Sequence, residues 1–230
     1  MKVLLINPPS RQLLVGNNPK FLDEERGYNP PLGLLYIGTA LAREGSHQVR
    51  VLDALVEELD YDALRTEIAS EKPDVVGITA MSFTLLDVIK VVSLVKKVLP
   101  EAVVVLGGPH VYLYPEETLR LEGVDYLIVG EGEFAFLEFM EFLEGKRKRS
   151  SVSGLVCQED GQIKKNAPAV IENVDEISLP DRTLLPYRKY NSLLFAGTPV
   201  TTMFTSRGCP YKCTFCDRPF SPVLSGFRWR

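Results

Sequence analysis

The sequence predicts a doubly wound α/β fold with a five-stranded parallel sheet. From Lys2 to about Gly145, short apolar runs alternate with longer segments of helical period, as in parallel strands joined by crossover helices. The apolar runs are rich in Val, Ile and Leu, as expected of strands buried on both faces. Right-handed crossovers would then place a ligand crevice beyond the carboxyl ends of the strands, at the topological switch point.

Five βα units follow one another along the chain. The expected strands are residues 3–6, 49–52, 75–79, 103–106 and 126–129. The expected helices are residues 32–44, 62–70, 85–99, 115–121 and 134–144. In the third helix, Leu85, Ile89 and Val92 fall on one stripe with Val88 and Val95 beside it, so most of this helix should face the sheet.

A linker is expected after the fifth unit. We divide the chain into a first domain at 1–146, a linker with a β-hairpin at 147–198, and the start of a second core at 199–230. The hairpin is expected over 154–165 because Asp160-Gly161 suits a type I′ turn between alternating strands. A final strand is expected over 200–205. The basic run at 146–149 is interpreted as solvated linker, with a localisation or nucleic-acid patch as the alternative.

Composition narrows the class of protein. The 230 residues carry a formal net charge of -4, which leaves no overall basic footprint for nucleic acid. No apolar run approaches the length of a membrane span, and the first residues lack the pattern of a signal peptide. We therefore expect a cytoplasmic protein, in which clustered cysteines bind metal or react more often than they form disulfides.

Three of the four cysteines are clustered. Cys209, Cys213 and Cys216 stand at i, i+4 and i+7, just after the last expected strand. Three thiolates on one loop can hold three irons of a cubane cluster and leave the fourth iron open. The alternatives are structural zinc, a disulfide or chance. An iron-sulfur cluster is favoured because zinc requires a fourth ligand, Cys157 is far away in the sequence, and a disulfide would leave an odd thiol.

Small residues recur where the five strands are expected to end. Glycines there let the backbone approach a ligand closely, and helix N-termini offer free N–H groups to phosphate. No G-x-G-x-x-G follows the first strand, so a nicotinamide fingerprint is absent. The candidate cofactor-binding residues at these ends are Pro8, Pro9, Met81, Ser82, Gly107, Gly108, His110, Gly130, Glu131, Gly132 and Glu133.

The cysteine segment resembles a known signature. C-x3-C-x2-C, preceded by Ser206-Arg207-Gly208, looks like the motif of radical S-adenosylmethionine enzymes. The resemblance implies that the three cysteines hold a 4Fe-4S cluster and that S-adenosylmethionine chelates the open iron. It also implies that reduction, by a partner such as flavodoxin or ferredoxin, cleaves this cofactor to a 5′-deoxyadenosyl radical.

The part before it resembles the Rossmann-like (flavodoxin-like) cobalamin-binding domain that precedes many radical S-adenosylmethionine cores. The matching segments are residues 30–36, 51–54, 73–78, 106–110 and 125–133. The D-x-H-x-x-G loop of methionine synthase-like domains is missing, which implies bound cobalamin with its base tucked away and no histidine on cobalt. His110 is either a contact to the corrin or a phosphate, or an ordinary loop histidine. Glu131 and Glu133 either favour the dipole of the fifth helix or contact a nucleotide hydroxyl.

The resemblance covers only the start of the expected radical core. A complete (β/α)8 barrel takes about 250 residues, and 14 residues follow Cys216, so a truncated barrel is expected. The chain would be a fragment, or would be completed by another polypeptide. The implied activity of the parent is methyl transfer or oxidative cyclisation. The alternatives are a non-catalytic cobalamin-binding module and a signalling domain with a zinc-bound tail.

Overall fold

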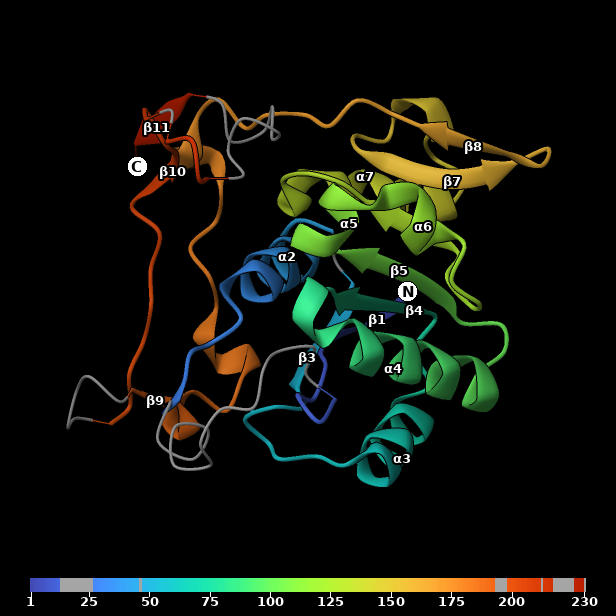
Figure 1. The fold of residues 1–230 in the computed structure, drawn as a ribbon, viewed down its shortest axis with the longest axis horizontal. Coiled ribbons are helices and arrows are strands. Elements are labelled where there is room, and N and C mark those ends of the chain that lie inside the picture. Colours follow the sequence, from blue (N-terminus) through green and yellow to red (C-terminus); the bar gives the residue numbers. More distant parts are fainter. Residues whose placement is uncertain (13–26, 46, 193–197, 212, 217–225, 230) are drawn as a thin grey trace.

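The computed structural model describes residues 1–12, 27–45, 47–192, 198–211, 213–216 and 226–229. Its centre is a seven-stranded sheet in the order β3-β1-β4-β5-β6-β7-β8 (Figure 1). The parallel strands are β1 (Lys2–Asn7), β3 (Gln48–Asp53), β4 (Val75–Thr79), β5 (Val103–Gly107) and β6 (Tyr126–Ile128). The expected doubly wound sheet is confirmed, and its direction reverses between β1 and β4, where a ligand crevice is expected.

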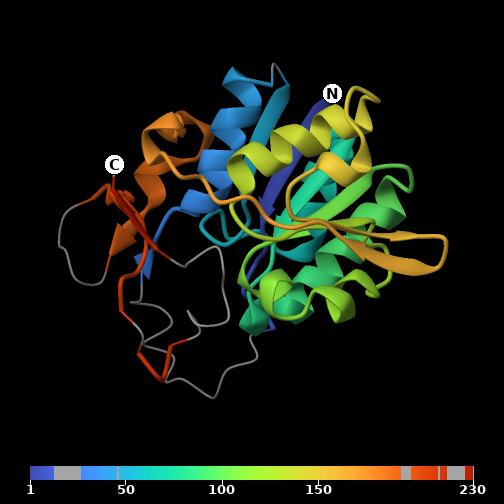
Figure 2. The same ribbon diagram turned by 90° about the horizontal axis from the view of Figure 1, so that it is seen from above.

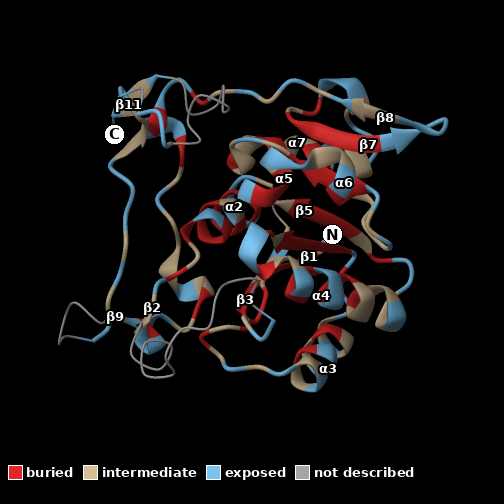
Figure 3. Ribbon diagram, in the orientation of Figure 1, coloured by how far each residue is buried: buried red, intermediate tan, exposed pale blue. Residues whose placement is uncertain are grey.

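Helices cover both faces of the sheet (Figure 2). On one face lie α2 (Leu32–Arg43) and α7 (Gly132–Leu143), and on the other lie α3 (Tyr61–Glu71) and α4 (Leu85–Val98). Along β1 the burial alternates between faces: Val3 and Leu5 join the core beneath α2 and α7, whereas Leu4 and Ile6 join the core beneath α3 and α4. This explains why the parallel strands are apolar throughout (Figure 3).

The helix expected at 115–121 is present as α6 (Pro115–Leu119), two residues shorter at its end. A short helix that was not expected, α5 (Pro109–Leu113), precedes it and is separated from it by Tyr114. Tyr114 has φ -132° and ψ 58°, outside the helical region. The reason is local, because the ring of Pro115 disfavours helical geometry in the preceding residue and Pro115 itself suits the first position of a new helix.

The expected hairpin is confirmed as β7 (Leu155–Glu159) and β8 (Gln162–Lys165). Asp160 and Gly161 both have positive φ, as a type I′ turn requires. β7 pairs antiparallel with β6, so the hairpin extends the central sheet. Two arginines of the preceding basic run form ion pairs: Arg147 with Glu138 and Glu141, and Arg149 with Glu159.

The strand expected over 200–205 is wrong. Residues 201–204 are in no strand, and the strand begins later, as β10 (Ser206–Gly208). The position of the strand follows its pairing, because β11 (Phe227–Trp229) lies antiparallel to it and opposite Ser206–Gly208. A second short pair joins β2 (Gly27–Tyr28) to β9 (Asn191–Ser192). None of the described helices has the length and apolar character needed to cross a bilayer.

Candidate functional site

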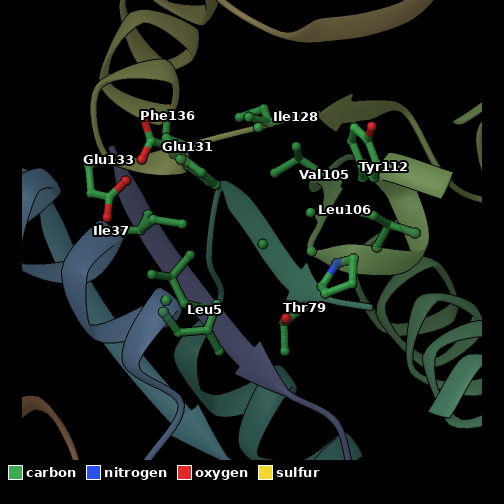
Figure 4. A pocket seen from close by; sticks show the side chains of 18 of the residues that line it. Leu5, Ile37, Thr79, Val105, Leu106, Tyr112, Ile128, Glu131, Glu133 and Phe136 are labelled. Atoms are coloured by element: carbon green, nitrogen blue, oxygen red, sulfur yellow. The ribbon is translucent and has the colours of Figure 1, made fainter. Parts of the chain in front are cut away.

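A pocket of about 540 Å³ opens beyond the carboxyl ends of the central strands (Figure 4). Its inner part is apolar, with Leu5, Val105 and Ile128 from the sheet and with Ile37 and Phe136 from α2 and α7. The pocket therefore enters the molecule on the face of the sheet that α2 and α7 cover. A flat apolar group can be buried here with a gain of about 25 cal/mol per Å² of apolar surface.

Glycine keeps the inner part of the pocket open. Gly77 lies in the middle of β4, and a Cβ atom there would come 2.7 Å from Leu5 Cδ2 and 3.2 Å from Phe136 Cε2. At the start of α7, a Cβ atom on Gly132 would come 2.6 Å from Ile37 Cδ1. Side chains at these two positions would collide with residues that line the pocket, so glycine lets the pocket walls keep their present positions.

The glycine loops form the rim. Gly107 is the last residue of β5 and Gly108 follows it, with φ 101° and ψ -179°, a conformation that is essentially restricted to glycine. The next loop follows β6 and leads into α7. Six of the eleven candidate cofactor-binding residues line the pocket: Gly107, Gly108, Gly130, Glu131, Gly132 and Glu133.

The other five candidates are not among the pocket-lining residues. Pro8 and Pro9 are buried after β1, and Met81 is half-buried before a 3-10 turn that begins at Ser82. His110 is buried, and its Nδ1 lies 3.0 Å from the Ser82 hydroxyl. Burial lowers the pKa of His110.

Residues from the far end of the chain cover the pocket, and sequence reasoning missed them as pocket residues. They are Phe204, Ser206, Arg207, Gly208 and Arg228. The one available signal was position, because Ser206-Arg207-Gly208 directly precedes the first cysteine of the cluster motif.

Arg207 connects this cover to the rim. Its guanidinium lies 5.4 Å from the ring of Tyr36 and 5.7 Å from the ring of Phe204. Arg207 also forms ion pairs with Glu131 and Glu133, at 3.3 and 2.5 Å. Burial alone lowers the pKa of Arg207, but the two carboxylates outweigh this effect and raise it, so the side chain stays charged.

The three clustered cysteines form no disulfide with one another in this structure. Cys209 and Cys216 are half-buried, Cys213 is exposed, and the N–H of Cys216 donates to the carbonyl of Cys213 at 3.2 Å. Within the described parts of the chain, no three His, Cys, Asp or Glu side chains are gathered closely enough to hold a metal ion. The structure thus places the cysteine loop beside the pocket cover without bringing the three thiols together.

A model of the B12 binding domain matches residues 22–140, which is more than half of the chain. The chain belongs to the B12-binding domain family. The matched range includes the glycine-rich rim and, except for Leu5, the residues named above for the apolar inner part of the pocket.

Curated relatives of this B12-binding chain extend the comparison. An uncharacterized methyltransferase of Pyrococcus horikoshii is 36% identical over 100% of this chain and 47% of its own length. The anaerobic magnesium-protoporphyrin IX monomethyl ester cyclase of Rubrivivax gelatinosus is 30% identical over 95% of this chain and 39% of its own length. The cytidylyl-2-hydroxyethylphosphonate methyltransferase of Streptomyces wedmorensis is 30% identical over 94% of this chain and 47% of its own length. The chain spans about half the length of these relatives or less.

Solved structures share the fold. OxsB, a cobalamin-dependent S-adenosylmethionine radical enzyme, superposes with a TM-score of 0.77 at 20% identity, over 99% of this chain and 29% of OxsB. TsrM from Kitasatospora setae, a radical S-adenosylmethionine methyltransferase, superposes with a TM-score of 0.64 at 21% identity, over 95% of this chain and 42% of TsrM. Together with the curated relatives, these likenesses confirm the resemblance to cobalamin-dependent radical S-adenosylmethionine proteins.

The residues of the B12-binding domain fit a corrinoid. Cobalamin has a flat aromatic base and a phosphate tail, which require an apolar slot and close backbone approach. Gly77 and Gly132 leave room that a Cβ would fill, and Gly108 brings backbone to the rim. For a 4Fe-4S cluster, the donor set fits by its chemistry, since three cysteines lie on one short loop.

Proposed function

We propose that this chain binds cobalamin in the strand-end pocket and, through Cys209, Cys213 and Cys216, a 4Fe-4S cluster that binds S-adenosylmethionine. In this proposal residues 1–146 are the cobalamin-binding unit, residues 147–198 the linker, and residues 199–230 the start of a radical core. The observation that carries it is the pocket itself, in which the rim of the B12-binding domain is covered by the segment that leads into the cysteine loop.

Each part of the pocket has a role in this proposal. The apolar inner part, around Leu5, Ile37 and Phe136, would receive the base of the cobalamin tail. Gly107, Gly108 and Gly130 would let the tail and the corrin edge approach the backbone. The location of His110, which bonds to Ser82 away from the pocket lining, supports a site in which no histidine reaches cobalt.

The chemistry follows from the two cofactors. Bound cobalamin supplies cobalt-centred methyl transfer or redox chemistry, and a three-cysteine cluster supplies the electron that cleaves S-adenosylmethionine. The protein's part is to hold the two sites adjacent and to cover the pocket against water. We propose methyl transfer or oxidative cyclisation as the reaction of the complete protein, with a reductant of the flavodoxin or ferredoxin class. Relatives of both kinds, methyltransferases and cyclases, support this choice.

Reconstitution tests the proposal. The chain is purified without oxygen, incubated with iron, sulfide and hydroxocobalamin, desalted, and examined by metal analysis and visible spectroscopy. We expect retained corrin and about four irons per chain. Cys213→Ala should lose iron and keep corrin, whereas Cys157→Ala should keep both, since Cys157 is buried in β7 outside the cluster motif.

A second variant pair tests the pocket. Gly33 lines the pocket from α2, and nothing lies within 4 Å of a Cβ built there. Gly33→Phe should therefore lower corrin retention by occupying the space, and Gly33→Ala should not. Corrin without iron would support a cobalamin-binding module without radical chemistry. Retention of neither cofactor by the parent chain would refute the proposal.

A further inference from the structure

Two buried carboxylates at the pocket rim are paired with arginines from the pocket cover. The side chains of Glu131 and Glu133 are 6% and 5% exposed, and those of Arg207 and Arg228 are 17% and 9% exposed. Arg207 contacts both glutamates, and Arg228 Nη1 lies 2.9 Å from Glu131 Oε2. Charges buried to this degree are costly unless they are paired, so each side of the cluster depends on the other.

The two arginines belong to one short ribbon, formed by β10 and β11. Arg207 and Arg228 are directly opposite each other in its antiparallel register. Like charges in such a pair destabilise a ribbon when nothing separates them. Glu131 resolves this repulsion, because its Oε1 faces Arg207 and its Oε2 faces Arg228. The ribbon therefore requires the carboxylate of Glu131 in order to pair and to lie on the pocket at the same time.

Further contacts hold the ribbon in the same place. The Arg228 guanidinium also donates to the carbonyl of Ile171 at 2.6 Å, and the N–H of Ile171 donates to Glu131 Oε2 at 2.7 Å. On the other side, the ring of Phe204 stacks on Tyr36 of α2 with 6.2 Å between centroids. The linker, the helix layer and the ribbon thus meet at the charged cluster.

We propose that Glu131, Glu133, Arg207 and Arg228 form a positioning lock that fixes the β10–β11 ribbon, and with it the start of the cysteine loop, over the pocket. Cys209 follows Gly208 at the end of β10, so the backbone that carries the first thiol leaves the ribbon at the locked position. The glutamates are positioning residues that act through the arginines. This inference rests on the proposed function. It explains how the chain would keep the cysteine loop, the proposed iron site, next to the proposed cobalamin pocket.

Hydrogen exchange of the cofactor-free full chain tests the lock. Glu131→Gln keeps the shape of the side chain and removes its charge. Peptides covering Ser206–Gly208 and Phe227–Trp229 should exchange about 100-fold faster or more in this variant, because one carboxylate of a buried charge cluster is lost. Arg207→Gln should give the same result from the ribbon side, because it removes the cation that pairs with both glutamates and changes no residue of the α/β core. Glu138→Gln is the matched control, since Glu138 lies in α7, which begins directly after Glu131, but pairs with Arg147.

The single tryptophan of the chain gives a second measurement. Trp229 lies in β11 opposite Ser206 and packs edge-on against Phe227 at 4.4 Å. Its fluorescence anisotropy reports local motion at β11 together with the rotation of the whole molecule, and the rotation is common to all folded variants. It should fall in Glu131→Gln and Arg207→Gln and stay unchanged in Glu138→Gln, while far-UV circular dichroism shows that all three variants are folded.

The outcomes separate the lock from the proposed function. Exchange within threefold of the parent in both lock variants would refute the lock, whatever the chain binds. After reconstitution, the lock variants should lose iron, and iron retention equal to that of the parent would refute the positioning role. Failure of the parent itself to retain either cofactor would refute the proposed function and leave the exchange result valid.

Discussion

Gly108 provides a sharp test of how the pocket rim is built. Its φ of 101° and ψ of -179° fall in a region that other residues occupy only at a cost of about 1–3 kcal/mol. A Cβ atom there would also lie 2.9 Å from the carbonyl oxygen of Ala80 and 3.1 Å from Thr79 Oγ1. Ala80 cannot yield easily, because its N–H donates to Gly107 and its carbonyl accepts from the N–H of His110. Overpacking of this kind adds about 1–3 kcal/mol.

Gly108→Ala should therefore lower the free energy of unfolding by about 2–6 kcal/mol. The assay is equilibrium unfolding in urea, followed by far-UV circular dichroism. Gly33→Ala is the control at the same pocket, since a Cβ there meets nothing, and its effect should lie between zero and a gain of about 1 kcal/mol. A loss below about 1 kcal/mol in Gly108→Ala would refute the argument that the rim depends on glycine geometry at this position.

Two further predictions concern buried polar groups. Tyr190 is buried, and its hydroxyl donates to Asp53 at 2.8 Å. Tyr190→Phe should therefore lower the free energy of unfolding in urea by about 1–2 kcal/mol. Tyr187→Phe is the control, because Tyr187 is exposed and its substitution should change this free energy by less than about 0.5 kcal/mol. Burial lowers the pKa of both His47 and His110 from 6.5, so both rings should titrate below 6.5 by NMR. Because the unfolded chain then binds more protons, each histidine should reduce stability as the pH falls below 6.5. Titration of either ring at or above this value would contradict the assignment of burial as the dominant cause.

The sheet was predictable because its signals are local. An apolar run such as residues 3–6 indicates a strand buried on both faces, and the structure divides it between two cores. The hairpin was likewise predictable from Asp160-Gly161, whose turn chemistry depends on two adjacent residues. The pairing of that hairpin with β6 was not, since it depends on a sheet edge that the folded domain leaves open.

Misplaced elements have equally physical causes. The apolar residues at 200–205 favour a strand by composition, yet strand pairing requires a partner, and the partner strand β11 lies opposite Ser206–Gly208. The helix α5 was not expected, and Pro115 separates it from α6 by restricting Tyr114, an effect that helical periodicity does not register.

Glu131 and Glu133 show most clearly where local reasoning ends. Their position before a helix favours a dipole contact, and their position at a strand end favours a ligand contact. The structure gives them a third set of partners, 76 residues away for the Glu131–Arg207 pair and 97 for Glu131–Arg228. Sequence spacing cannot reveal such a pairing, but charge balance can constrain it. Two buried acids at an otherwise apolar rim require cations as partners. The cysteine motif carries one such cation, an arginine two residues before its first thiol. Without these arginines, the two carboxylates would repel one another at the rim. With them, the carboxylates hold β10, which leads directly into the cysteine loop.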